Sequence, residues 1–397
     1  MSDSFPQKVI KKISHNISIT EFGVYAISIT ARCQGKDFLG IRKEQNLRVE
    51  INDRQFREIP PEKNIQLWKI PVAWNGTKLK GLSKTVVLIL PLNVEDYVFN
   101  FFADSEAVIE KFEYKPVPDF QNITFDLNER AEDGDRRPWY TFAFIDLPLL
   151  TLKADISTQW HFLDGDDVKL IIDNNVEPNS ESDRHRDWMW SAKPALFSKL
   201  KQEEKTFTTN LPVNTHYIEF WADKTPTLHK ISFDLGGFKP KRIPTVKDPE
   251  WTEDFNDDIE TMLLARLLLG EAETQSREAK LWVAGAVLNR VKAKAWPDTI
   301  REVILQRKQY DPFKSSDPNF SKITDPLGND TSKLRLQNWQ ECYELAEKII
   351  SGKIANPTTA THFNGIGVDR DDFIEKYIPQ GKFLKQIGDT HFYWSPN

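Results

Sequence analysis

The stretch LLARLLLGEAETQSREAKLWVAGAVLNRV, residues 263–291, decides the fold of the C-terminal part of the chain. Apolar residues at helical spacing precede Gly270, and a second, almost wholly apolar segment runs from Leu281 to Val291. Glycine often follows the end of a helix, so the pattern predicts one helix that stops at Gly270 and a second, buried helix. Glu271 then stands between them, where an apolar environment raises the pKa of a carboxyl group.

Capping residues define the expected ends of these helices. Asp257 or Asp258 can begin the first helix, and Ser276 can cap the second. Asn289 interrupts the apolar second helix and needs hydrogen-bond partners if it is buried. Thr299 and Glu302 have the spacing of a capping box for a short third helix.

The rest of the sequence from 253 to 397 has the pattern of a mainly α domain with long loops. Residues 311–330 are rich in Asp, Pro and Ser and are expected to form a loop, and the aromatic tail, 356–397, is expected to be irregular. Between them lies a helix that Gly352 closes. Its expected apolar face consists of Trp339, Cys342, Tyr343, Ala346 and Ile350.

Short motifs along this domain resemble those of the bacterial cell wall hydrolase family typified by the spore-cortex-lytic enzymes (the SleB type). They are, in order, Leu264-Ala265-Arg266, Gly270-Glu271-Ala272, Val283 to Val291, Gln309-Tyr310, Ala360-Thr361-His362-Phe363, and Ile387 to Tyr393. The resemblance implies a lysozyme-like fold in which a glutamate at a helix end faces a glycan groove. Glu273 and Gln275 depart from the family, which usually has Arg and a second acid there.

The same resemblance implies roles for individual residues. Glu271 becomes the catalytic acid, because cleavage of a glycosidic bond needs a proton donor near neutral pH. Gln309, Tyr310, His362 and Asn364 become substrate-binding residues. The structural alternatives stay open at this point: Tyr310 packs beneath the groove, Gln309 caps a turn, and His362 and Asn364 only stabilise the fold.

No second carboxylate stands at a motif position. Glu273, Asp311 and Asp389 are the alternatives, with Asp311 and Asp389 expected in turns. A single acid favours lytic transglycosylation, in which the 6-hydroxyl of muramic acid attacks its own anomeric carbon. Plain hydrolysis remains the other route.

The first 240 residues contain two copies of one unit. Lys84-Thr85 recurs as Lys205-Thr206, an offset of 205 − 84 = 121, and Ile51-Asn52-Asp53 meets Ile172-Asp173-Asn174 at the same offset. After a two-residue deletion, Phe101 to Asp104 matches Phe220 to Asp223. We therefore predict copy 1 over residues 1–118 and copy 2 over residues 119–238.

Apolar residues alternate in both copies, for example from Tyr25 to Cys33 and from Leu150 to Ile156. Alternation predicts strands with one buried face, so we expect two tandem all-β, jelly-roll-like sandwiches. In general form they look like carbohydrate-binding modules. The expected glycan platforms are Trp68, Trp74, Trp160, Trp188 and Trp190, with core packing as the alternative for each.

Two acidic turns, Asp133-Gly-Asp135 and Asp164-Gly-Asp166-Asp167, have calcium-type ligands, but such clusters are more often solvated turns. We predict no metal and no cofactor. The seven histidines show no paired metal spacing, which disfavours a zinc hydrolase. Cys33 and Cys342 fall in different predicted domains, so no disulfide is expected.

Composition narrows the remaining choices. The net charge of −6 does not suggest a nucleic-acid partner, and no run is long enough to span a membrane. The first 16 residues lack the apolar core of a signal peptide. Residues 239–252 carry three prolines among basic residues and predict an extended, semi-rigid linker.

The sequence thus predicts an extracellular enzyme of the cell wall that cleaves peptidoglycan between N-acetylmuramic acid and N-acetylglucosamine. Its N-terminal copies would bind glycan. The rival hypothesis is a cell-wall-binding or adhesion protein whose C-terminal domain is inactive.

Overall fold

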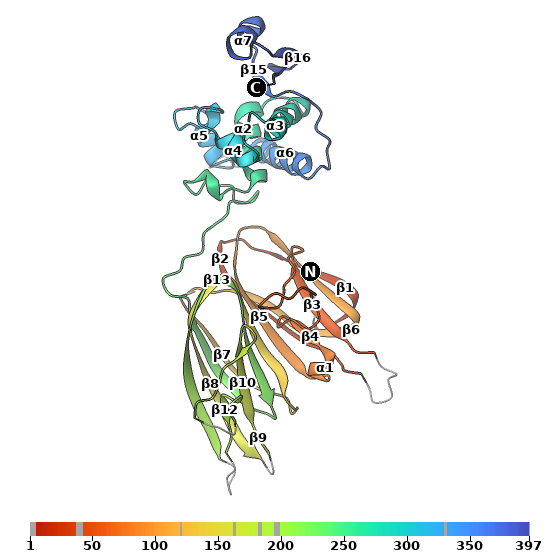
Figure 1. Cartoon of the computed structure of the whole chain (residues 1–397), viewed down its shortest axis with the longest axis vertical. Helices are drawn as coiled ribbons and strands as arrows, with labels where there is room; N and C mark the ends of the chain where they lie inside the picture. Colours follow the sequence, from red (N-terminus) through yellow and green to blue (C-terminus); the bar gives the residue numbers. More distant parts are fainter. Residues whose placement is uncertain are drawn as a thin grey trace. The chain divides into compact units, whose positions relative to one another are not determined.

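The computed structural model divides the chain into two compact units (Figure 1). Unit 1 comprises Met1–Leu92 and Asp96–Pro240, and unit 2 comprises Asn93–Glu95 and Lys241–Asn397. The structure describes residues 5–36, 43–119, 121–161, 164–181, 185–193, 199–328 and 332–396. Unit 1 is mostly β and unit 2 is largely helical, as the sequence predicts.

Unit 1 is built from long antiparallel strands. Copy 1 contributes β1 (Gln7–Ser18), β2 (Gly23–Arg32), β3 (Asn46–Ile51), β4 (Ala73–Asn75), the short helix α1 (Gly76–Leu79), β5 (Ser83–Leu92) and β6 (Asp96–Pro116). Copy 2 contributes β7 (Asn122–Arg130), β8 (Arg137–His161), β9 (Asp164–Gly165), β10 (Asp167–Ile172), β11 (Asn175–Val176), β12 (Trp190–Ser191), β13 (Leu200–Asp223) and β14 (Thr227–Asp234).

Corresponding strands of the two copies pair in the same register. Leu47 of β3 lies opposite Trp74 and Ala103. Val168 of β10, 121 positions later, lies opposite Trp190 and Ala222. The turns after these strands, at 52–53 and 173–174, both have two residues with positive φ. These pairings and turns recur at the predicted offset, and the duplication itself stays a prediction.

The two copies share one continuous sheet, because β5 pairs with β8 in parallel from Thr85 opposite Tyr140 to Ile89 opposite Phe144. Side chains alternate across a strand, so β5 serves two cores. Val86 and Leu88 belong to the core of copy 1. Val87 and Ile89 belong to the core of copy 2. The cores thus lie on opposite faces of the shared strands. The division into two separate sandwiches at residue 118 stays a prediction.

Two of the predicted glycan platforms are wrong. Trp74 and Trp190 have no exposed surface, and each indole N–H is bound by a backbone carbonyl, that of Lys84 and that of Glu203 respectively. A ring enclosed in a core cannot stack on a sugar. Trp188, two residues from Trp190, is instead half-buried against Lys169, and Trp68 is half-buried against Arg48. Trp160 is half-buried beside Gly165.

The acidic turns of copy 2 are held by neighbouring protein groups. Asp166 accepts hydrogen bonds from the backbone N–H groups of Gln159 and Thr225 at 2.9 Å each. The ammonium of Lys224 lies 3.4 Å from Asp135 and 3.5 Å from Asp164. Lys224 thus lies close to a carboxylate of each acidic turn.

Unit 2 packs its helices around one core. The elements are η1 (Phe255–Asp257), α2 (Glu260–Ala272), α3 (Arg277–Lys292), α4 (Ile300–Leu305), η2 (Asp311–Phe313), α5 (Phe320–Thr324), α6 (Lys333–Ile350) and α7 (Arg370–Tyr377). Ser276 and Thr299 cap α3 and α4 as predicted. Asn289 binds the carbonyls of Thr358 and Ala360, so its predicted need for partners is met.

The predicted end of the first helix at Gly270 is wrong, because α2 continues to Ala272. A Cβ atom at position 270 would lie 2.6 Å from Pro312 and 3.0 Å from Ile323. Glycine is therefore required there by the close approach of η2 and α5, and not by a change of backbone direction. Glu271 consequently belongs to the last turn of α2.

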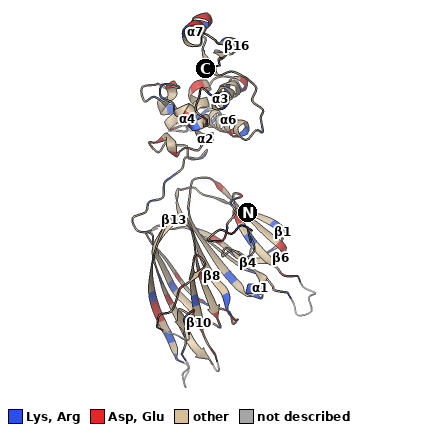
Figure 2. Cartoon of the chain, viewed as in Figure 1, with Lys and Arg blue, Asp and Glu red and all other residues tan. Residues whose placement is uncertain are grey.

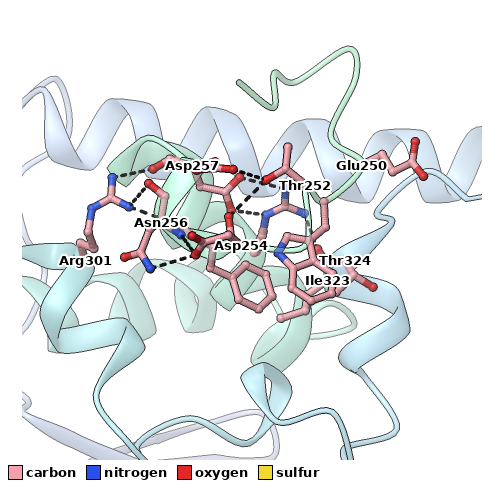
Figure 3. Close-up of polar contacts among 12 residues, drawn as sticks. Glu250, Thr252, Asp254, Asn256, Asp257, Arg301, Ile323 and Thr324 are labelled. Atoms are coloured by element: carbon pink, nitrogen blue, oxygen red, sulfur yellow. Dashed lines mark hydrogen bonds and ion pairs between the residues drawn. The ribbon is translucent and has the colours of Figure 1, made fainter. Parts of the chain in front are cut away.

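The predicted cap of the first helix is wrong as well, because Ile259 occupies the capping position and offers no side-chain bond. Asp258 is instead buried and forms a two-pronged ion pair with Arg266, at 2.6 and 3.0 Å. Arg301 donates to the carbonyls of Asn256 and Asp258 in the same network, and Thr252 donates to Asp257 (Figure 3). These bonds hold the first turn of the domain against α4.

Most of the predicted linker is anchored on unit 2. Arg242 pairs with Asp248 at 2.9 Å, and the backbone N–H of Trp251 donates to the carbonyl of Thr324 at 2.7 Å. The indole of Trp339 on α6 donates to the carbonyl of Val246. These contacts fix the segment from 242 to 251 in place, so it is not a free spacer.

The tail, expected to be irregular, forms a three-stranded sheet in the order β15 (His362–Gly365), β17 (Thr390–Trp394) and β16 (Lys382–Ile387). Cys33 and Cys342 are both free and buried, as predicted. Among the helices that the structure describes, none is both long and apolar enough to cross a bilayer.

Candidate active site

Glu271 lies at the end of α2, after three buried leucines at positions 267–269. Its side chain is half-buried, and no described residue donates a hydrogen bond to its carboxylate. Burial, followed by the charges of Asp311 and Asp317, raises the pKa of Glu271 to about 7. A carboxyl group of this kind keeps its proton near neutral pH and can donate it.

Arg290 is a buried cation whose charge acts on the Glu271 carboxyl group. It is almost fully buried on α3, where its Nη1 donates to the hydroxyl of Tyr310 at 2.9 Å and its Nε donates to the carbonyl of Thr361. The guanidinium also lies 4.2 Å from the ring of Trp296. Its charge lowers the pKa of Glu271, opposing burial, and would stabilise the carboxylate once the proton has left.

Our reading of the sequence missed Arg290, although the family motif contains it. A charged residue on an otherwise apolar helix was the signal that could have found it. Such a residue is buried only when it has specific partners.

Tyr310 is buried and does not present itself to a ligand. Only 4% of its surface is exposed, its ring stacks on Phe363 at 6.1 Å, and its hydroxyl accepts the bond from Arg290. This burial favours the alternative, packing beneath the site, over the predicted direct substrate contact of Tyr310. The backbone N–H of Gln309 donates to the carbonyl of Gln306, which places Gln309 in a turn.

His362 and Asn364 lie on β15. Burial, and then the charge of Arg290, lowers the pKa of His362 to about 4, so its imidazole is neutral at physiological pH. The Nδ1 atom of His362 lies 3.0 Å from the hydroxyl of Thr361. Asn364 accepts a bond from Tyr393, while its amide nitrogen is buried without a partner among the described residues. That unused donor suits a ligand oxygen.

The electrostatic contacts gather Glu271, Tyr310 and His362 around Arg290. The residues of this group are up to 91 positions apart in the sequence (362 − 271), and the packing of α2, α3 and β15 brings them together. Gln309 and Asn364 are not shown to contact this group.

Three of the other carboxylates, those of Glu273, Asp311 and Asp317, have partners in the structure. Glu273 pairs with Lys322 at 2.6 Å. Asp311 pairs with Lys314, and Asp317 accepts the backbone N–H of Asn319. Asp389 lies in the turn between β16 and β17, where Gln275 binds its backbone N–H. Asp317, which we did not predict, joins Asp311 as a carboxylate close enough to act on Glu271.

Comparison with known proteins gives one family. Residues 274–393 match the family model described as Cell Wall Hydrolase, a range that begins just after Glu271. A search among curated proteins gives no match.

Among solved structures, the catalytic domain of the germination-specific lytic transglycosylase SleB from Bacillus anthracis is 17% identical, with a TM-score of 0.23, covering 34% of this chain and 92% of that one. The catalytic domain of Bacillus cereus SleB is also 17% identical, with a TM-score of 0.24, covering 40% and 98%. The CUB1-EGF-CUB2 region of human MASP-1/3 is 9% identical, with a TM-score of 0.16, covering 58% and 99%. TM-scores this low carry no argument. The assignment rests on the family model, which identifies the C-terminal part of this chain as a domain of the cell wall hydrolase family.

Proposed function

We propose that unit 2 cleaves the glycan strand of peptidoglycan between N-acetylmuramic acid and N-acetylglucosamine, with Glu271 as the catalytic acid. The observation that carries the proposal is the half-buried Glu271 carboxyl, which has a raised pKa and no described hydrogen-bond donor. The family match supports the same substrate. We also propose that unit 1 binds glycan of the wall, which would place the enzyme outside the cell.

The reaction that fits one free carboxyl group is lytic transglycosylation. Glu271 gives its proton to the glycosidic oxygen, and the bond from that oxygen to the anomeric carbon breaks. The Glu271 carboxylate then takes the proton of the muramic acid 6-hydroxyl, whose oxygen forms the new bond to the anomeric carbon. No water is consumed, and Glu271 regains its proton. Both ordinary glycosidase routes need a second carboxylate. Glu273 and Asp311 are ion-paired here, and Asp317 accepts the backbone N–H of Asn319.

Substitution of Glu271 tests the acid. Glu271→Gln keeps the shape of the side chain but cannot protonate the leaving oxygen, so release of muropeptides should fall by about 100-fold or more. Glu273→Gln is the matched control, because Glu273 is two residues away and paired with Lys322; it should retain most activity. Near-normal turnover by a folded Glu271→Gln protein would refute the assignment. Inactivity of the unmodified protein on purified wall would favour the rival, a binding protein.

The products distinguish the two routes of cleavage. Transglycosylation leaves 1,6-anhydromuramic ends, which are lighter than reducing ends by one water molecule. We expect mass spectrometry of released muropeptides to find the anhydro form. If only reducing ends appear, a second carboxylate activates water, and Asp311, Asp317 and Glu273 are the first to substitute.

A further inference from the structure

A cavity of about 290 Å³ lies inside unit 1, between the two copies. One wall is the segment of copy 1 from Glu58 to Lys78, and the other is formed by copy 2, from β10 and β13. Ligand sites often lie at junctions between modules, and this volume is at the lower end of the ~300–1,000 Å³ typical of small-molecule sites. Apolar surface comes from Ile59, Pro60, Pro61, Ile70, Pro71, Pro138 and Ile171.

Trp221 supplies the one aromatic ring among the described residues that line this cavity. It is half-buried, and its indole N–H donates to Glu219 at 3.1 Å, which fixes the orientation of the ring. The ammonium of Lys78 lies 5.2 Å from the ring centroid. An indole held in a fixed orientation at a cavity wall is a surface on which the apolar face of a sugar ring can stack.

The equivalent position of copy 1 differs from Trp221. Phe102 corresponds to Trp221 in the alignment of the copies and lies between Arg48 at 4.2 Å and Lys12 at 5.1 Å. It has no polar atom, and it does not line the cavity. Of these two equivalent aromatic positions, the one in copy 2 lines the cavity and the one in copy 1 does not.

The charged groups of the cavity wall balance one another. The lining includes three carboxylates, those of Glu58, Glu62 and Glu219, and three lysine side chains, those of Lys69, Lys78 and Lys84. Burial lowers the pKa of Lys84 to about 7. Figure 2 shows acidic and basic residues interspersed over the strands of unit 1. A ligand with one sign of charge gains little from such a wall. A neutral ligand with many hydroxyl groups can donate to the carboxylates and accept from the ammonium groups.

Glu58 has an acceptor atom that a hydrogen-bond donor of the ligand can satisfy. Its Oε2 atom is buried without a hydrogen-bond partner among the described residues. A buried acceptor without a partner is destabilising, and a ligand hydroxyl that donated to it would remove that cost.

The wall that carries Glu58 is also held in place. Lys84 is buried, and its ammonium donates to the carbonyls of Pro71 and Ala73, the latter at 2.8 Å. These bonds tie the end of the segment to β5. A wall that is already ordered loses little entropy when a ligand binds.

We infer that this cavity is a saccharide-binding site, with Trp221 as the stacking platform and Glu58 as a hydrogen-bond acceptor for a sugar hydroxyl. The inference rests on the glycan-binding role proposed for unit 1 and names the site through which unit 1 performs it. It replaces Trp74 and Trp190, which the core encloses.

Fluorine NMR on the full chain can test the site directly. The protein is labelled with 5-fluorotryptophan in the Glu271→Gln background, so that the probe is not cleaved. The resonance missing from Trp221→Phe identifies Trp221, and the one missing from Trp188→Phe identifies Trp188, a predicted platform outside the cavity. On titration with a β-1,4-linked N-acetylglucosamine tetramer, the Trp221 resonance should shift and saturate, whereas a shift at Trp188 in its place would assign binding to that platform and overturn the inference. A Trp221 resonance unmoved at saturating probe would overturn the inference.

Glu58→Gln provides a second arm that does not disturb the packing of Trp221. Because Oε2 has no partner, the melting temperature should change little, while the saturation midpoint at Trp221 should rise by about tenfold. An unchanged midpoint would remove Glu58 from the site. Failure of the catalytic proposal has a different signature: the Trp221 shift persists although the unmodified enzyme releases no muropeptides.

Discussion

At Glu271, burial and the charges of Asp311 and Asp317 act on the carboxyl group in the same direction, against the charge of Arg290. The balance keeps the group protonated below about pH 7, so the general acid is lost as pH rises through that value. We expect kcat/KM for muropeptide release to fall above pH 7. Initial rates measured on soluble peptidoglycan across the neutral range check this. A rate that already falls near the ordinary glutamate pKa, ~4.3, would contradict the environment described.

The raised pKa of Glu271 also affects stability. The folded state holds this proton up to about pH 7, whereas the unfolded chain releases it near the ordinary glutamate value, so stability falls as pH rises between the two. Glu271→Gln should therefore gain on the order of 1 kcal/mol relative to the unmodified protein at pH 8, and little at pH 4. Denaturant unfolding at both pH values measures the difference. Glu273→Gln, which loses an ion pair, should show no such gain.

Helix α2 is held at both ends by contacts that depend on single residues. At its start, Asp258 and Arg266 are both buried, and Arg266 also donates to the carbonyl of Ile323 on α5. Arg266→Met would leave Asp258 buried without its partner and should cost ~3–5 kcal/mol of unfolding free energy. The double variant Asp258→Leu with Arg266→Met should recover part of that loss, because no charge remains buried. Equal losses in the single and double variants would argue against the pair.

At its end, α2 lies against η2 and α5 through Gly270. Alanine has the higher helix propensity, by ~1 kcal/mol, but its Cβ would overlap Pro312 at 2.6 Å. We expect overpacking to win, so that Gly270→Ala destabilises unit 2 by ~1–3 kcal/mol. Activity should fall too, because a shift of η2 would move Asp311, whose charge raises the pKa of Glu271.

Gly367→Ala is the control for Gly270→Ala. No heavy atom lies within 4 Å of the Cβ position at Gly367, so that change should be nearly neutral. Thermal melts of both variants, with muropeptide release, make the comparison. A Gly270→Ala protein more stable than the parent would show that the contact with Pro312 relaxes easily.

Over the whole molecule, the shared sheet makes the two copies of unit 1 depend on each other. Copy 1 alone would expose Val24, Ala26, Val87 and Ile89, which complete the core of copy 2. We expect a fragment of residues 1–240 to unfold cooperatively and to sediment with purified wall, whereas residues 1–118 aggregate or stay unfolded. Near-UV circular dichroism and thermal melts test this. A sharply melting 1–118 fragment would support two independent sandwiches.

The local signals of the sequence determined the helical half of the molecule well. Ser276 and Thr299 cap their helices because a cap involves residues only two or three positions apart. The apolar period of α3 and α6 likewise depends on one helix at a time. Glu271 was placed by its motif at the end of a helix, and the repeat offset of 121 indicated which strands of the two copies correspond.

The tertiary structure decided what depends on neighbours that are distant in sequence. Gly270 does not end a helix. Glycine is needed there because Pro312, 42 positions later in the sequence (312 − 270), leaves no room for a Cβ atom. Trp74 and Trp190 lie in cores while Trp221 lines a cavity, a difference that strand alternation alone does not predict because it depends on which other segments cover each strand. The tail forms a sheet because β17 pairs with a strand on either side of it. The pKa of Glu271 is raised because the fold encloses its carboxyl group beside Asp311 and Asp317, against the opposing charge of Arg290. Burial and long-range pairing are properties of the packed chain, so no local pattern contains them.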